Sequence, residues 1–209
     1  MLKVGLTGGI ASGKTVVGEM FVELGAHLIQ ADSISHELMQ PGQSVYYEVV
    51  AHFGREILNS DGTVNRAKLA EAAFGKAPST SASRIEELNR IVHPFVIRRQ
   101  EDWMEEVGRQ DSQAIAIVEA ALILEAHATK SFDRLIVVTC GDEQRIARFA
   151  ARHKLDLDAA RKEVARRMAA QLPEAEKIKA ADYVIDNSGS LDHTREQVQQ
   201  VWGKLRPSR

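Results

Sequence analysis

Short apolar runs alternate with longer amphipathic segments along this chain. The apolar runs predict five strands, at residues 2–6, 26–30, 114–118, 134–140 and 183–186. Segments with apolar residues at helical spacing predict helices at 14–24, 33–39, 45–53, 66–74, 83–107, 142–153, 158–170 and 191–205. The strand runs show little polar alternation, which is typical of parallel strands buried on both faces. This order of elements predicts a doubly wound α/β fold.

Two stretches of the chain fit that core poorly. Residues 31–113 are almost wholly helical in pattern, which is too long for one crossover between strands. Two helices again replace one between residues 142 and 187. Insertions of this kind in α/β nucleotide folds commonly form substrate lobes and lids over the strand ends. Within the 83–107 pattern, Pro94 predicts that the helix ends or kinks near His93.

A complete G-x-x-x-x-G-K-[ST] string runs from Gly8 to Thr15, after the first predicted strand and at the start of the first predicted helix. Its glycines let successive N–H groups converge on phosphate oxygens, and the helix adds its positive end. Lys14 can reach the β- and γ-phosphates, and the Thr15 hydroxyl can ligate Mg²⁺. The string therefore predicts a nucleoside triphosphate site. The residues expected to contact the nucleotide there are Gly9, Ile10, Ala11, Ser12, Gly13, Lys14, Thr15 and Val16.

A carboxylate stands at the end of the second predicted strand. Ligands of parallel α/β sheets bind outside the carboxyl ends of the strands, where the phosphate loop also lies. Asp32 can there accept the proton of an acceptor hydroxyl or help to hold the metal. The other interpretation is that Asp32 caps the helix expected to start at Ser33.

Basic residues concentrate between residues 145 and 167. This span holds eight arginines and lysines against three acidic residues, although the whole chain has 27 basic and 29 acidic residues. Arg145, Arg148 and Arg152 share one face of a predicted helix. Guanidinium groups on a mobile helical pair can stabilise a transferring phosphoryl group, as a lid does. In a chain with no phosphate loop, a solvated basic helix face is the better interpretation. The phosphate loop at residues 8–15 of this chain favours the lid.

Composition narrows the choice of partners. The formal net charge of −2 gives no basic field for nucleic acid or an anionic membrane, so neither is expected as a partner. The single cysteine, Cys140, excludes an intrachain disulfide and is compatible with a reducing cytosol. The longest apolar stretch, 114–124, is interrupted by Glu119 and is too short to span a membrane. No signal peptide is expected at the N-terminus, and the predicted location is the cytoplasm.

Several segments together resemble the dephospho-CoA kinase family. They are the loop TGGIASGKT, the element ADSISHELMQPG that contains Asp32, the pair His93-Pro94, residues 121–125, the string RMAAQ that starts at Arg167, and ADYVIDNSGS at 181–190. The resemblance covers residues 2–201. It implies a P-loop kinase with a five-stranded parallel sheet, a helical CoA-binding lobe over residues 33–112 and a lid over residues 144–180. Such a kinase transfers the γ-phosphoryl of ATP to the ribose 3′-hydroxyl of dephospho-CoA, the last step of coenzyme A synthesis.

The resemblance also implies roles for individual residues. Asp32 matches the base for the acceptor hydroxyl, and Asn187 lies where the adenine of ATP is approached. His93 matches a histidine of the acceptor lobe, although it can equally be a capping residue at a helix kink. The catalytic set expected on this basis is Asp32, Lys14, Arg148, Arg152 and Arg167, with Thr15 on the magnesium.

The chain departs from the family pattern at two positions. Gln30 stands where the family often has a second aspartate, and Ala121 stands where it usually has proline. Gln30 removes a negative charge and can weaken metal binding, whereas Ala121 alters only local backbone stiffness. Two other functions stay open: another P-loop small-molecule kinase, such as a nucleoside monophosphate kinase, and a nucleotide-dependent regulatory ATPase. A monomer is the expected state.

Overall fold

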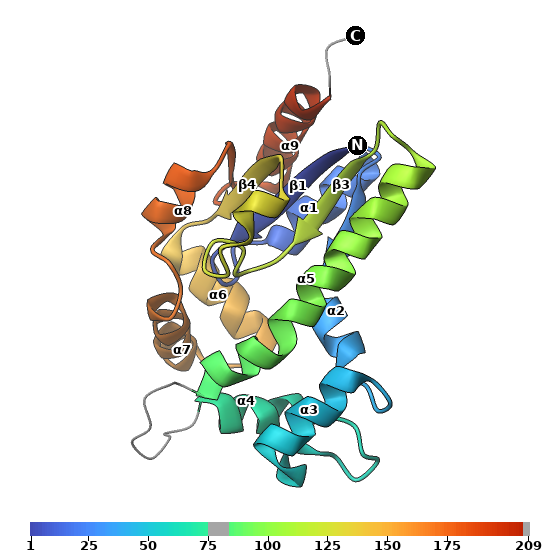
Figure 1. Cartoon of the computed structure of the whole chain (residues 1–209). Coiled ribbons are helices and arrows are strands. Elements are labelled where there is room, and N and C mark those ends of the chain that lie inside the picture. Colours follow the sequence, from blue (N-terminus) through green and yellow to red (C-terminus); the bar gives the residue numbers. More distant parts are fainter. Residues whose placement is uncertain (75–83, 207–209) are drawn as a thin grey trace. The chain divides into compact units, whose positions relative to one another are not determined.

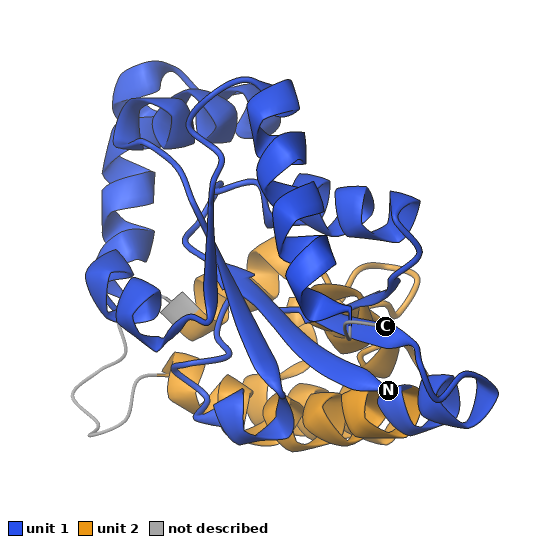
Figure 2. Ribbon diagram, turned by 90° about the horizontal axis from the view of Figure 1, so that it is seen from above, with its two compact units in different colours: residues 1–30, 104–209 blue, residues 31–103 orange. Residues whose placement is uncertain are grey.

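The structure is a computed structural model, and residues 1–74 and 84–206 of it are described here. The chain divides into two compact units, which Figure 2 shows in blue and orange. Unit 1 comprises Met1–Gln30 and Met104–Arg209, and unit 2 comprises Ala31–Trp103. None of the described helices is both long and apolar enough to cross a membrane.

Unit 1 is built on a five-stranded sheet. Its strands are β1 (Leu2–Gly8), β2 (His27–Gln30), β3 (Ile115–Glu119), β4 (Arg134–Thr139) and β5 (Tyr183–Asp186). The order across the sheet is β2-β3-β1-β4-β5, and every pairing is parallel. The predicted α/β fold with a five-stranded parallel sheet is therefore confirmed.

Both faces of the sheet are covered by apolar side chains. On one face, Val4 and Leu6 of β1 pack with Phe21 of α1 (Lys14–Glu23) and Val198 of α9 (Leu191–Leu205), helices that lie side by side in Figure 1. On the other face, Leu135 and its neighbours pack against the segment that follows β3. Burial on both sides explains why the strand runs show so little polar alternation.

Three helices, not the expected two, separate β4 from β5. They are α6 (Asp142–His153), α7 (Leu157–Ala169) and α8 (Glu174–Ala180). No apolar stripe marks α8 in the sequence, because its one buried residue is Lys177. The Lys177 ammonium forms an ion pair at 2.9 Å with Glu125, in the segment between β3 and η2 (Ala128–Ser131), and its side chain is 1% exposed. A buried charge pair thus anchors α8.

Unit 2 is helical. It contains α2 (Ala31–Leu38), α3 (Ser44–Phe53), η1 (Arg55–Ile57), α4 (Arg66–Phe74) and most of α5 (Arg84–Gln110). The helix expected over residues 83–107 corresponds to α5, and its expected first residue, 83, lies outside the described residues. Of the two expected outcomes, an end or a kink near His93, the end is wrong, because α5 continues through Pro94; the kink stays a prediction. Val92 and Val96 are buried on either side of the proline, so packing outweighs the hydrogen bond that proline removes.

Candidate active site

The carboxyl ends of the strands gather the polar residues of unit 1. The loop Gly9–Gly13 follows β1, and Glu119 is the last residue of β3. Cys140 follows β4, and Asn187 follows β5. Because all strands are parallel, these positions lie at one edge of the sheet, where ligands of α/β folds bind.

The backbone of the loop has a shape that only certain residues adopt. Gly13 has φ 92° and ψ 25°, in the left-handed region that favours glycine. A Cβ atom at Gly13 would lie 2.0 Å from Nδ2 of Asn187, so the position also lacks space for a side chain. Ala11 likewise has a positive φ, of 53°. The loop is therefore held in a strained curl, as a phosphate-binding loop requires.

The Lys14 side chain folds back over the phosphate loop and contacts its backbone. Its ammonium donates to the carbonyl oxygens of Gly8 at 3.1 Å and of Gly9 at 3.2 Å. The buried Ser12 hydroxyl has no hydrogen-bond partner among the described residues. A cation and a buried hydroxyl on one tightly curled loop suit an anionic ligand.

Thr15, Glu119 and Gln30 form a chain of side-chain hydrogen bonds. The Thr15 hydroxyl donates to Oε1 of Glu119 at 2.9 Å, and Nε2 of Gln30 donates to Oε2 of the same carboxylate at 3.0 Å. Glu119 is 8% exposed. Sequence reasoning did not place Glu119 in the site, although it is the one charge that interrupts the longest apolar stretch. A carboxylate beside the Thr15 hydroxyl is an oxygen donor set of the kind that Mg²⁺ prefers.

Asn187 and Arg148 hold the outer side of the loop. Nδ2 of Asn187 donates to the Ser12 carbonyl at 2.8 Å, and Arg148 donates to the Asn187 carbonyl at 2.9 Å. Arg148 also reaches the Ser12 carbonyl at 3.4 Å. Thr194 donates to Oδ1 of Asn187 at 2.9 Å. Both ends of the Asn187 amide are therefore engaged within the protein, and its approach to adenine stays a prediction.

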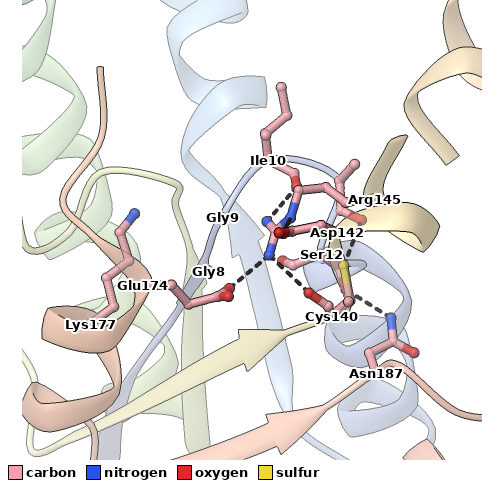
Figure 3. Close-up of polar contacts among 12 residues, drawn as sticks. Gly8, Gly9, Ile10, Ser12, Cys140, Asp142, Arg145, Glu174, Lys177 and Asn187 are labelled. Carbon is pink, nitrogen blue, oxygen red and sulfur yellow. Dashed lines mark hydrogen bonds and ion pairs between the residues drawn. The ribbon is translucent and has the colours of Figure 1, made fainter. Parts of the chain in front are cut away.

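Arg145, which the sequence places on the basic helix face with Arg148 and Arg152, is fully buried in the structure. Its side chain comes from the first turn of α6 and lies beneath the loop, between Ile10, Cys140 and Glu174 (Figure 3). Nothing in the sequence around Arg145 distinguishes it from the exposed arginines of the same span. Burial raises the pKa of the neighbouring Cys140 thiol, and the Arg145 and Arg148 charges oppose that rise.

The other two expected lid arginines lie at the surface. Arg152 is exposed in the last turn of α6. Arg167 on α7 donates to Glu163 at 2.6 Å and lies over the Phe149 ring at 5.2 Å from its centroid. Hydrogen bonds from Arg166 and Arg167 lower the pKa of Glu163 to about 2, with partial burial opposing them.

Asp32 and His93 belong to unit 2. Asp32 is exposed in the first turn of α2, which begins at Ala31 and not at residue 33 as expected. Asp32 therefore lies within the helix and does not precede it as an N-cap. His93 is half-buried inside α5, next to Pro94 and away from the helix ends, and burial lowers its pKa. The roles of both residues toward a ligand stay predictions.

A parallel sheet in the order β2-β3-β1-β4-β5, with a G-x-x-x-x-G-K-T loop after its central strand, defines the P-loop kinase class. A crystal structure of the protein TT1252 from Thermus thermophilus superposes with a TM-score of 0.76 at 27% identity, covering 99% of this chain and 98% of that one. A shikimate kinase from Bacteroides thetaiotaomicron shares the fold, with a TM-score of 0.54 at 13% identity over 98% of each chain.

Sequence comparison identifies the family within this class. The profile of the dephospho-CoA kinase family matches residues 2–193. A dephospho-CoA kinase from Corynebacterium jeikeium is 38% identical over 98% of this chain and 100% of its own length. One from Syntrophotalea carbinolica is 39% identical over 99% of this chain and 93% of its own length. The chain belongs to the dephospho-CoA kinase family and is an ATP-dependent kinase of coenzyme A synthesis.

Proposed function

We propose that this chain transfers the γ-phosphoryl of ATP to the ribose 3′-hydroxyl of dephospho-CoA, with the loop Gly9–Thr15 holding the triphosphate. The observation that carries the proposal is the curled loop with Lys14 lying along its carbonyls, in a chain of this family. On binding, the Lys14 ammonium exchanges the carbonyls of Gly8 and Gly9 for oxygens of the β- and γ-phosphates. Little covalent work is left to the protein beyond positioning and charge stabilisation.

Mg²⁺ fits the donors at the end of β3. The Thr15 hydroxyl and the Glu119 carboxylate would hold it, directly or through water, and they lie 2.9 Å apart. The ion supplies positive charge against the oxygens of the phosphate chain. Gln30, at the position where the family often has an aspartate, donates to Glu119 and so orients this carboxylate without adding a second negative charge.

Asp32 is the proposed general base. It follows β2 by two residues, is exposed, and stands in the segment that resembles the family's aspartate element. In this proposal its carboxylate takes the proton from the 3′-hydroxyl as the oxygen attacks the γ-phosphorus. Unit 2, with His93, would supply the acceptor lobe expected over residues 33–112.

The proposed lid comprises residues 144–180. Arg148 is already hydrogen-bonded to the loop, and Arg152 and Arg167 project from the next turns of α6 and from α7. Closure of these helices would bring the guanidinium groups onto the transferring phosphoryl and exclude water, which suppresses hydrolysis of ATP. The Glu163–Arg167 ion pair would then open, since the guanidinium exchanges a carboxylate for a phosphate oxygen.

We further propose that the protein works as a monomer in the cytoplasm, with a small-molecule substrate and without a nucleic-acid or membrane partner. The balanced charge of 27 basic and 29 acidic residues supports the absence of a nucleic-acid or anionic-membrane partner. Light scattering coupled to gel filtration, with and without substrates, tests the oligomeric state.

The decisive assay measures ADP release from ATP·Mg²⁺ with and without dephospho-CoA, together with the mass of the product. We expect ADP only with the acceptor, beside a product heavier by one phosphoryl group. ADP formed equally without acceptor would indicate a regulatory ATPase. Transfer to a nucleoside monophosphate in its place would indicate the other kinase class.

A matched pair of variants tests the base. Asp32→Asn should lower kcat by at least ~10²-fold, because a lost general base costs about 10²–10⁴-fold in rate, while ATP binding survives. Glu37→Gln removes an exposed carboxylate from the same helix and should leave kcat unchanged. Equal activity of the two variants would remove Asp32 from this role.

A further inference from the structure

Arg145 is a charged side chain that folding has taken entirely out of water. It is 0% exposed and is among the largest fully buried side chains of unit 1. Nη1 donates to the Ile10 carbonyl at 2.8 Å, and Nη2 donates to the Cys140 carbonyl at 3.1 Å and to Glu174 at 2.8 Å. Burying a cation is costly unless it is paired and hydrogen-bonded, so these contacts call for a reason beyond packing.

The loop is shaped around this guanidinium. A Cβ atom at Gly9 would lie 2.3 Å from Nη1 of Arg145, so only glycine fits there while the arginine keeps its place. Figure 3 shows the guanidinium between the loop at Ile10 and the Glu174 carboxylate on α8. Nε is buried without a hydrogen-bond partner among the described residues, and its separation from Asp142 is 3.8 Å. Glu174 is thus the carboxylate hydrogen-bonded to this cation, and the exposed Asp142 forms a second, longer ion pair with it.

The bond to Ile10 also orients the loop's donors. In a trans peptide the C=O and the following N–H point in opposite directions. Because the Ile10 carbonyl points toward Arg145, the Ala11 N–H points away from Arg145, to the opposite side of the loop. No backbone carbonyl of the described residues accepts a hydrogen bond from that N–H. Asn187 orients a second peptide of the loop in the same way, because its amide holds the Ser12 carbonyl, two residues after Ile10.

We propose that Arg145 is a positioning residue for the nucleotide. It turns the Ile10–Ala11 peptide toward the phosphates and places a positive charge behind the loop. The Glu174 carboxylate sets how far that positive charge is neutralised. The inference rests on the proposal that this loop binds the triphosphate. It assigns opposite effects to the two members of one ion pair. Loss of the cation weakens binding of an anion, whereas loss of the Glu174 charge leaves the cation less neutralised and strengthens it.

The test measures the dissociation constants of ADP and ATP by calorimetry. Arg145→Gln should weaken binding about 10–100-fold, the equivalent of a lost hydrogen bond to a charged group. Arg145→Lys should lie between it and the unaltered chain, because an ammonium keeps the charge but cannot form the planar fork. Glu174→Gln should tighten binding about two- to fivefold, the range for one partly exposed charge pair.

Steady-state kinetics separates positioning from catalysis. The KM for ATP should rise in Arg145→Gln, the KM for dephospho-CoA should stay unchanged, and kcat should fall far less than in Asp32→Asn. Arg195→Gln is the matched control, since it removes an exposed arginine of α9 that pairs with Glu23 of α1 and lies outside the proposed lid. Its nucleotide affinity should equal that of the unaltered chain.

A purely structural ion pair predicts that Arg145→Gln and Glu174→Gln weaken binding alike, and that result would overturn the inference. So would unchanged ADP affinity in Arg145→Gln. If Arg145→Gln does not fold, the opposite shifts of Arg145→Lys and Glu174→Gln decide the question. Failure of the underlying assignment has a different signature: the unaltered chain would then bind ADP no better than Lys14→Ala does.

Discussion

The contact between Gly13 and Asn187 allows a stability effect to be calculated from the structure. Gly13→Ala would force a non-glycine residue to φ 92°, at a cost of about 1–2 kcal/mol for a left-handed conformation. The new Cβ would lie 2.0 Å from Nδ2 of Asn187 and displace that amide from the Ser12 carbonyl. Because Asn187 is 2% exposed, leaving these groups unpaired costs about 1–3 kcal/mol more. The total expected loss is about 2–5 kcal/mol.

Gly25→Ala is the matched control for backbone strain. Gly25 also has a positive φ, of 105°, but a Cβ there would meet nothing within 4 Å. This variant should lose only the conformational part, about 1–2 kcal/mol. Urea denaturation followed by tryptophan fluorescence measures both free energies of unfolding.

A double-mutant cycle isolates the contact itself. In an Asn187→Ala background the clash is absent, so Gly13→Ala should cost no more than Gly25→Ala does. The expected coupling between the two positions is therefore about 1–3 kcal/mol. Equal costs of Gly13→Ala in the two backgrounds would refute the idea that Asn187 supports the loop from outside.

Three further changes have defined outcomes. Lys14→Ala should weaken ATP binding and lower kcat together, as measured by calorimetry and ADP release; a fully active variant would contradict the phosphate-loop assignment. Lys177→Ala leaves the Glu125 carboxylate without its buried partner and should lower the free energy of unfolding by about 3–5 kcal/mol in urea denaturation, whereas a loss below 1 kcal/mol would show that α8 does not depend on this pair. Since hydrogen bonds from Arg166 lower the pKa of Glu163 from 4.5 to about 2, this carboxylate stabilises the fold above pH 4.5, and its contribution is lost as the pH falls toward 2. The stability difference between the unaltered chain and Glu163→Gln should therefore shrink over that range, and a constant difference would argue against the shift.

Local pattern determined the sheet, most helices and the phosphate loop of this chain. Strand runs such as 134–140 are recognisable because a parallel strand buried on both faces must be apolar nearly throughout. The loop is recognisable because glycines, Lys14 and Thr15 must stand at set positions to surround a phosphate. These constraints act over a few neighbouring residues, so each produces a pattern that can be recognised within one short stretch of sequence.

Tertiary structure alone decided which side chains support that loop. Arg145 meets Ile10 across 135 positions of the chain, and Asn187 meets Ser12 across 175. The burial of these side chains depends on how strands are ordered in the sheet, and no pattern near them in the sequence distinguishes them from surface residues. The same reason explains Pro94, whose helix-breaking tendency is local while the packing that overrides it comes from elsewhere in the fold. Sequence thus determined the shape of the phosphate loop, and long-range contacts decided what holds it in place.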